Sequence, residues 1–573
     1  MLGMDDVRKT CITGKLPPPV GTSDWAEFSR KCFCVDKTLL IKDILDSETS
    51  VALFTRPRRF GKTTALKMIR AFFEKRTDAN GAVVDTSYLF TDKKIWAAGE
   101  KYRALQGRFP IIYLSFKDHK ADNWESAAGK LVRDVGAEVE RHRASVDGGL
   151  AEGGRCERLR RLMECKATID EVSESLGLLA EAIHAHEGVK PIVLIDEYDQ
   201  PISSASTFGY YDKMCSFMRM FLSGAMKDNE HVEMGLMTGV LRVAKEGILS
   251  GLNNLDVYTV FDASMSEYFG FTEDEVRAMA EYYGVPGKID EIRAWYDGYD
   301  FGGTEIYNPW SVLNYFKKNC SAAPYWLDTS SNDLITEIVR DLPHGIEKTL
   351  RALLAEDPAQ NAPVVPMASE LGPYADVRRR KDTLYALLVS AGYLKVASPL
   401  ENGYCRVRIP NHELEQVFVH DIQNKINAGM EHGADEIATA LIDRDPAALK
   451  VAIGRFLVES VSYFDSAAEG FYHGLTLGFL AILRGRFRVT SNGESGDGRF
   501  DLMLRPYLPG FAGFVIEVKA ADSDADDLKA LAAAALRQID EKDYPSALRA
   551  EGVADIVRIG LAYRRKRVEL ALG

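Results

Sequence analysis

The ten residues from Thr55 to Thr64, TRPRRFGKTT, leave few folds open to this chain. An apolar, β-leaning run precedes them (50–55), and apolar residues at helical spacing follow them (62–75). A strand, a glycine-containing loop and a helix in this order are typical of a phosphate-binding loop, and the triplet G-K-T at 61–63 matches the end of its pattern, G-x-x-x-x-G-K-[ST]. We therefore expect an α/β fold in which a strand and the following helix hold this loop between them.

The loop departs from the usual pattern at its first position, where the sequence has Arg56 in place of glycine. Gly61 still lets the backbone approach a phosphate closely, and the start of the following helix still offers unpaired N–H groups. Arg56, Arg58 and Arg59 are expected to add positive charge near the phosphates. We predict a modified but functional phosphate-binding loop.

Strands and helices alternate through the first 262 residues. The predicted buried strands are 50–55, 110–116, 191–199 and 233–240, and the helical stretches between them include 124–135 and 169–186. Such alternation predicts a parallel sheet that is covered by helices on both faces. The pattern weakens after about residue 262.

The third of these strands ends in two acids, Asp196 and Glu197, which is the Walker B form. In such a site the aspartate orders Mg²⁺, and the neighbouring glutamate polarises the attacking water. The alternative is a buried strand whose acidic end merely reaches solvent. A phosphate-binding loop of correct order in the same chain favours the first interpretation.

Composition excludes several classes of protein. The chain has 573 residues, 46% hydrophobic and 27% charged, as in ordinary soluble proteins of roughly three or four domains. Its net charge of −13 excludes a globally basic nucleic-acid binder, so any such surface must be local. The N-terminus has no apolar signal core, and no run is long enough to span a bilayer. Eight scattered cysteines fit reduced thiols, so we expect a cytoplasmic protein.

The C-terminal region carries a second set of candidate catalytic residues. Asp501 lies near the start of one alternating strand, and Glu517 and Lys519 lie on one face of the next. The connecting residues RPYLPGFAG are those of a hairpin, which would bring the three side chains together. An E-x-K tripeptide alone is a weak signal, but its order after an aspartate strengthens it. Two carboxylates and a lysine suit Mg²⁺ or Mn²⁺, and such a metal can activate water against a phosphodiester.

The region between these two sets, about 264–430, is less informative. FTEDEVRAMAEYYG predicts a capped helix, and residues 381–422 suggest a helix, a hairpin and a helix, as in a winged helix. The four cations at 378–381 are either a solvated face or a DNA contact. The aromatic residues of WYDGYDFGG (295–303) either pack a lid domain or stack on bases, and packing is the favoured interpretation.

Motifs along nearly the whole chain resemble those of the bacterial and archaeal AAA-ATPase-like proteins with a C-terminal PD-(D/E)XK nuclease-like domain. The matching segments are FCVDKTLLIKDIL, LFTRPRRFGKTTALKM, VLIDEYDQPI, MTGVLRVAKEGILSGLNNL, WYDGYDFGG, IYNPWSVLNYF, FYHGLTLGFL, SNGESGDGRFDLML and VIEVKA. That family's loop usually has the same arginine-rich form without the first glycine, so Arg56 is no departure within it.

The resemblance and the chemistry together assign roles. The nucleotide-binding candidates are Arg59, Phe60, Gly61, Lys62, Thr63, Thr64, Asp196, Thr238 and Arg242. Lys62 would reach the β/γ-phosphates, Thr63 and Asp196 would hold Mg²⁺, and Glu197 would be the catalytic base. Thr238 is either a sensor of the γ-phosphate or a threonine that satisfies a strand end. Arg242 could contact the γ-phosphate, either in its own subunit or in a neighbouring one. The alternative is a plain surface arginine.

At the second site, Asp501, Glu517 and Lys519 are the catalytic candidates, and Asp501, Glu517 and Glu469 are the metal ligands. Glu469 matches the helical acid of such sites and shares a helix face with His473. Gln538 and Tyr544 match the usual accessory residues, although Tyr544 is equally well a core residue.

We therefore predict three parts: an AAA-like P-loop domain (1–262), a helical and winged-helix-like middle region (263–430) and a restriction-endonuclease-like α/β domain (431–573). The expected function is an ATP-controlled, Mg²⁺- or Mn²⁺-dependent nuclease, acting on DNA in defence or mobile-element biology. The alternatives are a regulatory NTPase switch whose nuclease-like domain binds without cleaving, and a toxin that acts on RNA. A homo-oligomer is possible, and no membrane partner is expected.

Overall fold

The computed structural model divides the chain into two compact units, Met1–Val417 and Phe418–Gly573, which are described separately here. The described residues are those outside 1–14, 22–23, 79, 150–152, 243–251, 253, 327–348, 350–352, 354–361, 369–379, 399–401, 417, 419–432, 461–468, 481–482, 484–485, 508–510, 522 and 524.

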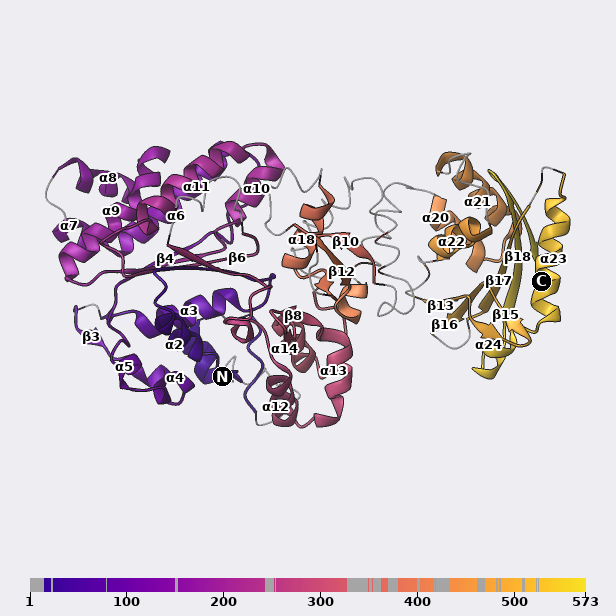
Figure 1. Ribbon diagram of the computed structural model, residues 1–573, viewed down its shortest axis with the longest axis horizontal. Helices are drawn as coiled ribbons and strands as arrows, with labels where there is room; N and C mark the ends of the chain where they lie inside the picture. The colour runs from indigo at the N-terminus through magenta and orange to yellow at the C-terminus, as the bar shows by residue number, and fades with distance from the viewer. Residues whose placement is uncertain are drawn as a thin grey trace, which may run out of the picture. The chain divides into compact units, whose positions relative to one another are not determined.

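A five-stranded, all-parallel sheet forms the centre of the first unit, as the alternating pattern predicts (Figure 1). Its strands, in spatial order, are β4 (Ile111–Ser115), β5 (Ile192–Asp196), β6 (Met234–Gly239), β1 (Val51–Thr55) and β7 (Leu255–Tyr258). Four of the five are the predicted strands. The fifth, β7, was not predicted, because its residues LDVY are only partly buried at the sheet edge and have no clear apolar pattern.

Alternate residues of each strand face two different helical layers. Val51 and Leu53 of β1 pack into one core, and Ala52 and Phe54 pack into the other. The first layer consists of α6 (Trp124–Arg141), α7 (Arg143–Gly149), α8 (Gly154–Met163), α9 (Ile169–Glu187), α10 (Gln200–Phe208) and α11 (Tyr211–Met226). The second consists of α1 (Trp25–Lys31), α2 (Leu39–Asp46), α3 (Lys62–Phe73), α4 (Lys94–Ala97) and α5 (Glu100–Arg103). Figure 1 shows the two layers on opposite faces of the sheet, and both predicted helices, 124–135 and 169–186, lie in the first.

After the parallel sheet, three helices of the first unit pack around a small apolar core of their own. They are α12 (Glu273–Tyr283), α13 (Ile289–Tyr296) and α14 (Pro309–Lys317). The predicted cap of α12 is present, since Thr272 and Glu275 form a capping box. Next come α18 (Lys381–Ser390) and a three-stranded sheet, which match the predicted helix and hairpin. The strands of this part are β8 (Tyr299–Phe301), β9 (Thr304–Ile306), β10 (Val364–Pro366), β11 (Lys395–Val396) and β12 (Tyr404–Arg408).

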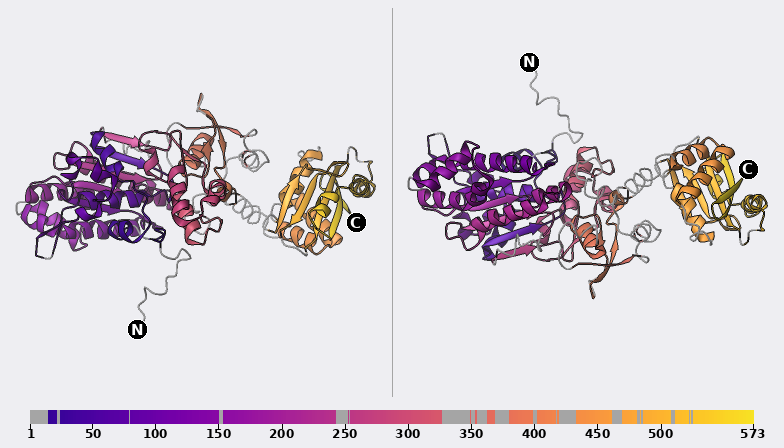
Figure 2. Two further views of the ribbon diagram at one scale, coloured as in Figure 1. Left: turned by 90° about the horizontal axis from the view of Figure 1, so that it is seen from below. Right: turned by 90° about the horizontal axis from the view of Figure 1, so that it is seen from above.

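The second unit is a mixed five-stranded sheet between two groups of helices, and Figure 2 shows this layering from two further directions. Its strands, in spatial order, are β13 (Phe487–Ser491), β16 (Leu502–Pro506), β17 (Gly513–Ala520), β18 (Ile556–Arg564) and β19 (Arg567–Leu572). Only β17 and β18 pair in parallel. One face packs against α20 (Gly433–Ile442), α21 (Pro446–Ser460) and α22 (Glu469–Leu480), and the other against α23 (Leu528–Glu541) and α24 (Ser546–Ala550).

The remaining short elements are β2 (Arg76–Thr77), β3 (Val83–Val84), β14 (Glu494–Ser495), β15 (Gly498–Arg499) and the 3₁₀ turns η2 (Ser87–Leu89), η3 (Ser266–Tyr268) and η4 (Pro286–Lys288). No helix within the described ranges combines the length and the apolar character needed to cross a bilayer.

Candidate functional site

The phosphate-binding loop joins the buried strand β1 to α3. Gly61 is the N-cap of α3 and has φ = 82°, a left-handed conformation that side chains with a Cβ rarely adopt. The backbone conformation therefore favours glycine at this position. Lys62 follows as the first helical residue, where N–H groups without intrahelical partners face the loop.

The Lys62 side chain is folded into the loop and is only 5% exposed. Its Nζ donates to the main-chain carbonyls of Arg56 and Pro57, both at 2.8 Å. Burial lowers the pKa of Lys62 to about 8, although the carboxylates of Glu197, Asp199 and Asp196 oppose this effect. The ammonium is therefore still mostly protonated at pH 7, at the position where the loop pattern expects a cation.

The end of β5 brings the predicted magnesium ligands together. Asp196 is fully buried, and its Oδ2 accepts from Thr63 Oγ1 at 2.7 Å. Its Oδ1 accepts from Thr238 Oγ1, at the end of β6, at 2.6 Å. Thr238 is 1% exposed, and its hydroxyl donates to Asp196, which it thereby orients. This geometry fits the interpretation of Thr238 as a residue that satisfies a strand end.

Glu197, the predicted base, follows with φ = 54°, and its N–H lies 3.4 Å from Thr238 Oγ1. Burial raises the pKa of its carboxyl group, and Lys62 opposes the rise. A carboxylate whose pKa is raised accepts a proton more readily, as a general base must.

A cavity of about 780 Å³ opens over the loop, within the first unit. Among the residues that the structure describes, seven cationic side chains and two carboxylates, Asp118 and Glu197, line it. The cations are Lys37, Arg58, Arg59, Lys62, Lys117, Lys120 and Lys130. Apolar residues also line the cavity, among them Trp25, Phe28, Phe33, Met68, Phe271 and Trp310. A polyanion with an aromatic group matches such a lining. Of the predicted loop residues, 59–64 all line it, whereas Arg242 is not among its described lining residues.

One expectation about the arginines is wrong. Arg56 does not face the cavity: it is fully buried, and its Nη1 donates to the carbonyls of Thr55 (2.9 Å) and Tyr258 (2.7 Å). Its guanidinium lies over the rings of Phe269 and Phe301, and burial lowers its pKa to about 10. Arg56 therefore ties the start of the loop to the end of β7.

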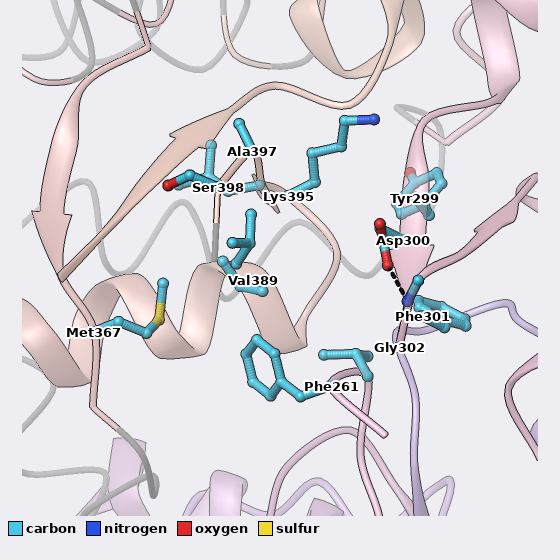
Figure 3. Close-up of a pocket in the computed structure, with 14 residues that line it drawn as sticks. Phe261, Tyr299, Asp300, Phe301, Gly302, Met367, Val389, Lys395, Ala397 and Ser398 are labelled. Atoms are coloured by element: carbon cyan, nitrogen blue, oxygen red, sulfur yellow. Dashed lines mark hydrogen bonds between the residues drawn. The ribbon is translucent and has the colours of Figure 1, made fainter. Parts of the chain in front are cut away.

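The loop also packs against the later part of the first unit. The Phe60 ring lies 4.8 Å from Tyr299 and 5.2 Å from Phe301, and Arg59 lies 4.0 Å above the ring of Trp310. Tyr299 and Phe301 are each 2% exposed, so the aromatic residues of the WYDGYDFGG segment act in packing, as the favoured interpretation expected. A second pocket, of about 410 Å³, lies beside them (Figure 3). Asp300 closes the hairpin turn there by accepting from the Gly303 N–H at 2.7 Å.

Sequence patterns did not single out Glu413, a fully buried acid in the same unit. Its carboxylate accepts from Ser311 Oγ (2.7 and 2.9 Å) and from the Trp326 N–H (2.9 Å). Burial raises the pKa of Glu413 to about 7, against the lowering effect of these donors and of Arg59. The carboxyl group is thus near half-protonation at neutral pH.

We expect Glu413→Gln to make the first unit more stable than the wild type at alkaline pH. A carboxyl whose folded pKa lies near 7 and unfolded pKa near 4.5 makes the fold lose stability between those values, by up to ~3 kcal/mol. Glutamine keeps the shape and an acceptor without the charge. Melting midpoints from pH 5 to 8.5 should therefore diverge, with the variant higher at alkaline pH. Glu305→Gln, at an exposed position, is the control. Parallel curves for Glu413→Gln and wild type would contradict the burial argument.

The second candidate site lies in the second unit, where the predicted hairpin forms. β16 and β17 pair with Leu502 opposite Ile516, which places Asp501 beside Glu517. Asp501 Oδ2 accepts from the Val518 N–H at 2.8 Å, and Lys519 Nζ donates to Glu517 Oε1 at 3.2 Å. The three predicted catalytic side chains therefore gather at one sheet end.

Glu517 is 2% exposed, and burial, reinforced by Asp501, raises its pKa to about 7. Gln538 Nε2 also donates to Glu517 Oε1, while the buried Oε2 has no hydrogen-bond partner in the described part of the chain. A buried carboxylate oxygen without a donor, beside a second carboxylate, is a suitable ligand for a hard divalent cation. Asp501 and Glu517 thus fit Mg²⁺ or Mn²⁺.

Two accessory residues surround this pair. Gln538 Nε2 lies 3.2 Å from the hydroxyl of Tyr544, which is 2% exposed and belongs to a small apolar core. Tyr544 is thus a core residue that also contacts the site through Gln538. His473 Nε2 lies 3.2 Å from the Asp501 carbonyl and 3.3 Å from Ser491 Oγ. Glu469 begins α22, but its side chain lies outside the described residues.

No cluster of three or more His, Cys, Asp or Glu side chains that could hold a metal ion occurs among the residues the structure describes. Each site offers two oxygen donors instead: Thr63 with Asp196, and Asp501 with Glu517.

The folds and sites define a P-loop ATPase-like domain and a restriction-endonuclease-like domain in one chain. Residues 19–249 match the family model described as Predicted AAA-ATPase, and residues 467–571 match that of the PD-(D/E)XK nuclease superfamily. The chain therefore carries an AAA-ATPase-like domain and a C-terminal PD-(D/E)XK nuclease superfamily domain, which confirms the resemblance found in its motifs.

The proteins similar to the chain include one known from its sequence and one of known structure. An uncharacterized protein from the vnfD 5′ region of Azotobacter chroococcum is 28% identical over 404 residues, which cover 69% of this chain and 68% of the relative. A Walker-type ATPase of Pyrococcus abyssi, of known structure, is 14% identical with a TM-score of 0.35, covering 67% of this chain and 96% of that protein.

Proposed function

We propose that this protein is an ATP-controlled, divalent-metal-dependent nuclease that acts on DNA, with a role in defence or mobile-element biology. The observation that carries the cleavage function is the buried, unpartnered oxygen of Glu517 beside Asp501 and Lys519. Domains of these two classes generally use ATP and divalent metal ions. A basic, partly aromatic cavity over the G-K-T loop supports the nucleotide function.

At the nucleotide site, each residue has a separable task. Lys62 would neutralise the β/γ-phosphates, while Thr63 and Asp196 would hold Mg²⁺, which neutralises phosphate charge when bound. Glu197 would accept the proton of the attacking water, with its raised pKa favouring that step. Thr238 fixes the orientation of Asp196 through its 2.6 Å hydrogen bond.

At the nuclease site, Asp501 and Glu517 would hold the divalent ion, which when bound lowers the pKa of water and stabilises phosphoryl charge. Lys519 would orient the attacking water and stabilise the extra negative charge on the phosphate. Gln538 holds Glu517 in position by donating to its Oε1. Asp501 is held by the Val518 N–H.

The direct test is to incubate the purified full chain with plasmid, single-stranded DNA and RNA, with Mg²⁺ or Mn²⁺, and with or without ATP. We expect DNA cleavage that requires the metal and changes with ATP. Binding of DNA without cleavage would favour the regulatory switch, and cleavage of RNA alone would favour the toxin. Either result would overturn the proposal.

We expect Lys62→Ala to weaken ATP binding by about 10- to 100-fold, since a charge-assisted hydrogen bond contributes about 1.5–3 kcal/mol. Titration calorimetry with ATP and Mg²⁺ measures the change. Lys67→Ala, on the same helix but outside the described cavity lining, should bind ATP like wild type. Unchanged ATP affinity in Lys62→Ala would contradict the phosphate-loop interpretation.

A further inference from the structure

The loop that follows β4, residues 116–123, lies at the nucleotide cavity and carries two of its lysines. Lys117 and Lys120 both line the cavity, together with Glu197 and Lys62. β4 neighbours β5 in the sheet, so this loop emerges beside the strand end that carries Asp196 and Glu197. The segment FKDHKADN matches no phosphate-binding pattern, so the sequence motifs do not point to these lysines.

Hydrogen bonds fix this loop at several points. The Phe116 N–H donates to the Asp196 carbonyl at 2.9 Å, which joins the loop directly to the Walker B strand. Lys130 Nζ donates to the carbonyls of Asp118 (3.3 Å) and Lys120. Tyr210 donates its hydroxyl to the Ala121 carbonyl at 2.7 Å. The loop backbone is therefore held in place before any nucleotide binds.

The buried His119 also fixes the loop, since its Nε2 lies 2.8 Å from Oδ2 of Asp134, a residue of α6. With His119 turned inward, Lys117 and Lys120 on either side of it are exposed. Lys117 is the closer of the two in sequence to the Phe116 anchor on Asp196. Lys117 thus directly follows the residue that is bonded to the Walker B strand, and its exposed side chain lines the nucleotide cavity.

We propose that Lys117 supplies, within its own chain, a second cation that contacts the terminal phosphate of ATP during hydrolysis. This proposal rests on the ATPase function proposed above. P-loop enzymes gain about 10³- to 10⁵-fold in rate from such a cation, which is provided either by the same chain or by a partner. Lys117 lines the cavity that holds Lys62 and Glu197, whereas Arg242, the sequence candidate for this task, is not among the described lining residues.

The charge balance of the cavity agrees with this role. Lys62 is bonded to two loop carbonyls, so it serves the loop side of the phosphates. Asp118 and Glu197 are the two carboxylates, against seven cations. Lys117 lines the same cavity as Glu197 and follows the residue bonded to Asp196, so from there it could reach the terminal phosphate, which becomes more negative as water attacks.

The test uses the full chain with Lys117→Ala, Lys117→Arg and Lys166→Ala, the last being an exposed lysine of another loop. We expect Lys117→Ala to bind ATP and ADP within about threefold of wild type but to lose ~10²-fold or more in kcat. Lys117→Arg should recover part of the rate, and Lys166→Ala should match wild type. Binding of ADP with aluminium fluoride, which imitates the transferring phosphoryl group, should weaken only in Lys117→Ala.

Mixing two inactive variants distinguishes the source of the cation. Lys62→Ala keeps Lys117 but binds ATP poorly, and Lys117→Ala binds ATP without this lysine. If Lys117 acts within its own chain, the mixture stays inactive; recovered turnover would overturn the proposal in favour of a partner's lysine. Turnover that survives in Lys117→Ala would overturn the Lys117 proposal alone. No turnover in wild type would overturn the proposed ATPase function, and the Lys117 proposal with it.

Discussion

Glu197→Gln should bind ATP with nearly wild-type affinity and hydrolyse it ~10²- to 10⁴-fold more slowly, the range that a general base contributes. The amide keeps the shape of the side chain and cannot accept the proton. The expected phosphate contacts come from Lys62 and Thr63 and not from Glu197, so binding should persist. Phosphate-release kinetics under saturating ATP, together with calorimetric ATP binding, measure the two effects separately.

The same variant tests whether ATP binding, more than each hydrolysis event, sets the state of the nuclease. The loop packs through Phe60 and Arg59 on the later part of the first unit, so a nucleotide can bias that packing. A ligand shifts such an equilibrium only through its different affinities for two arrangements. With ATP retained, cleavage by Glu197→Gln should be persistently on or persistently off. Cleavage with an ATP response identical to that of wild type would mean that the two sites act independently.

The second large effect is expected from Lys519→Ala, which should lower DNA cleavage by ~10²-fold or more while ATP hydrolysis survives. Among the described residues, Lys519 is the cation that donates to Glu517, so its loss would remove positive charge beside the expected phosphate position. Plasmid nicking with Mg²⁺ or Mn²⁺ measures the loss, and phosphate release measures the ATPase.

Lys529→Ala, an exposed lysine at the start of α23, is the matched control for a change of charge in the same unit. Its cleavage rate should equal that of wild type. If Lys519→Ala cut DNA normally, the D…E-x-K set would not be the catalytic site, whatever its geometry. Loss of ATP hydrolysis in this variant would show instead that the substitution damages more than the nuclease site.

The parts of the fold that follow from short-range patterns were predictable. Strand β1, the G-K-T loop and α3 follow one another directly, and the hairpin that joins Asp501 to Glu517 closes over a short connection. The Walker B strand was equally clear, because it is an apolar run that ends in two acids. These are local features, and local features are what a single sequence displays.

What could not be predicted depends on contacts distant in sequence. Lys117 and Glu197 line one cavity only because β4 and β5 are neighbours in the sheet. Glu413 is buried beside Ser311, about a hundred residues earlier in the chain, whose hydroxyl donates to it. Arg56 was placed near the phosphates from its position in the loop, but the carbonyl of Tyr258 and two aromatic rings hold it elsewhere. No spacing rule encodes such partners.

Because Arg56 faces inward, the two ends of this loop are fixed in different ways, one by a side-chain contact and the other by backbone conformation. At Gly61 the positive φ angle favours glycine. At position 56 the arginine side chain donates to the Tyr258 carbonyl. The loop thus keeps the spacing of the pattern, but its first position holds an arginine that bonds to the neighbouring strand β7 in place of a glycine. A search that requires both glycines would pass over this loop.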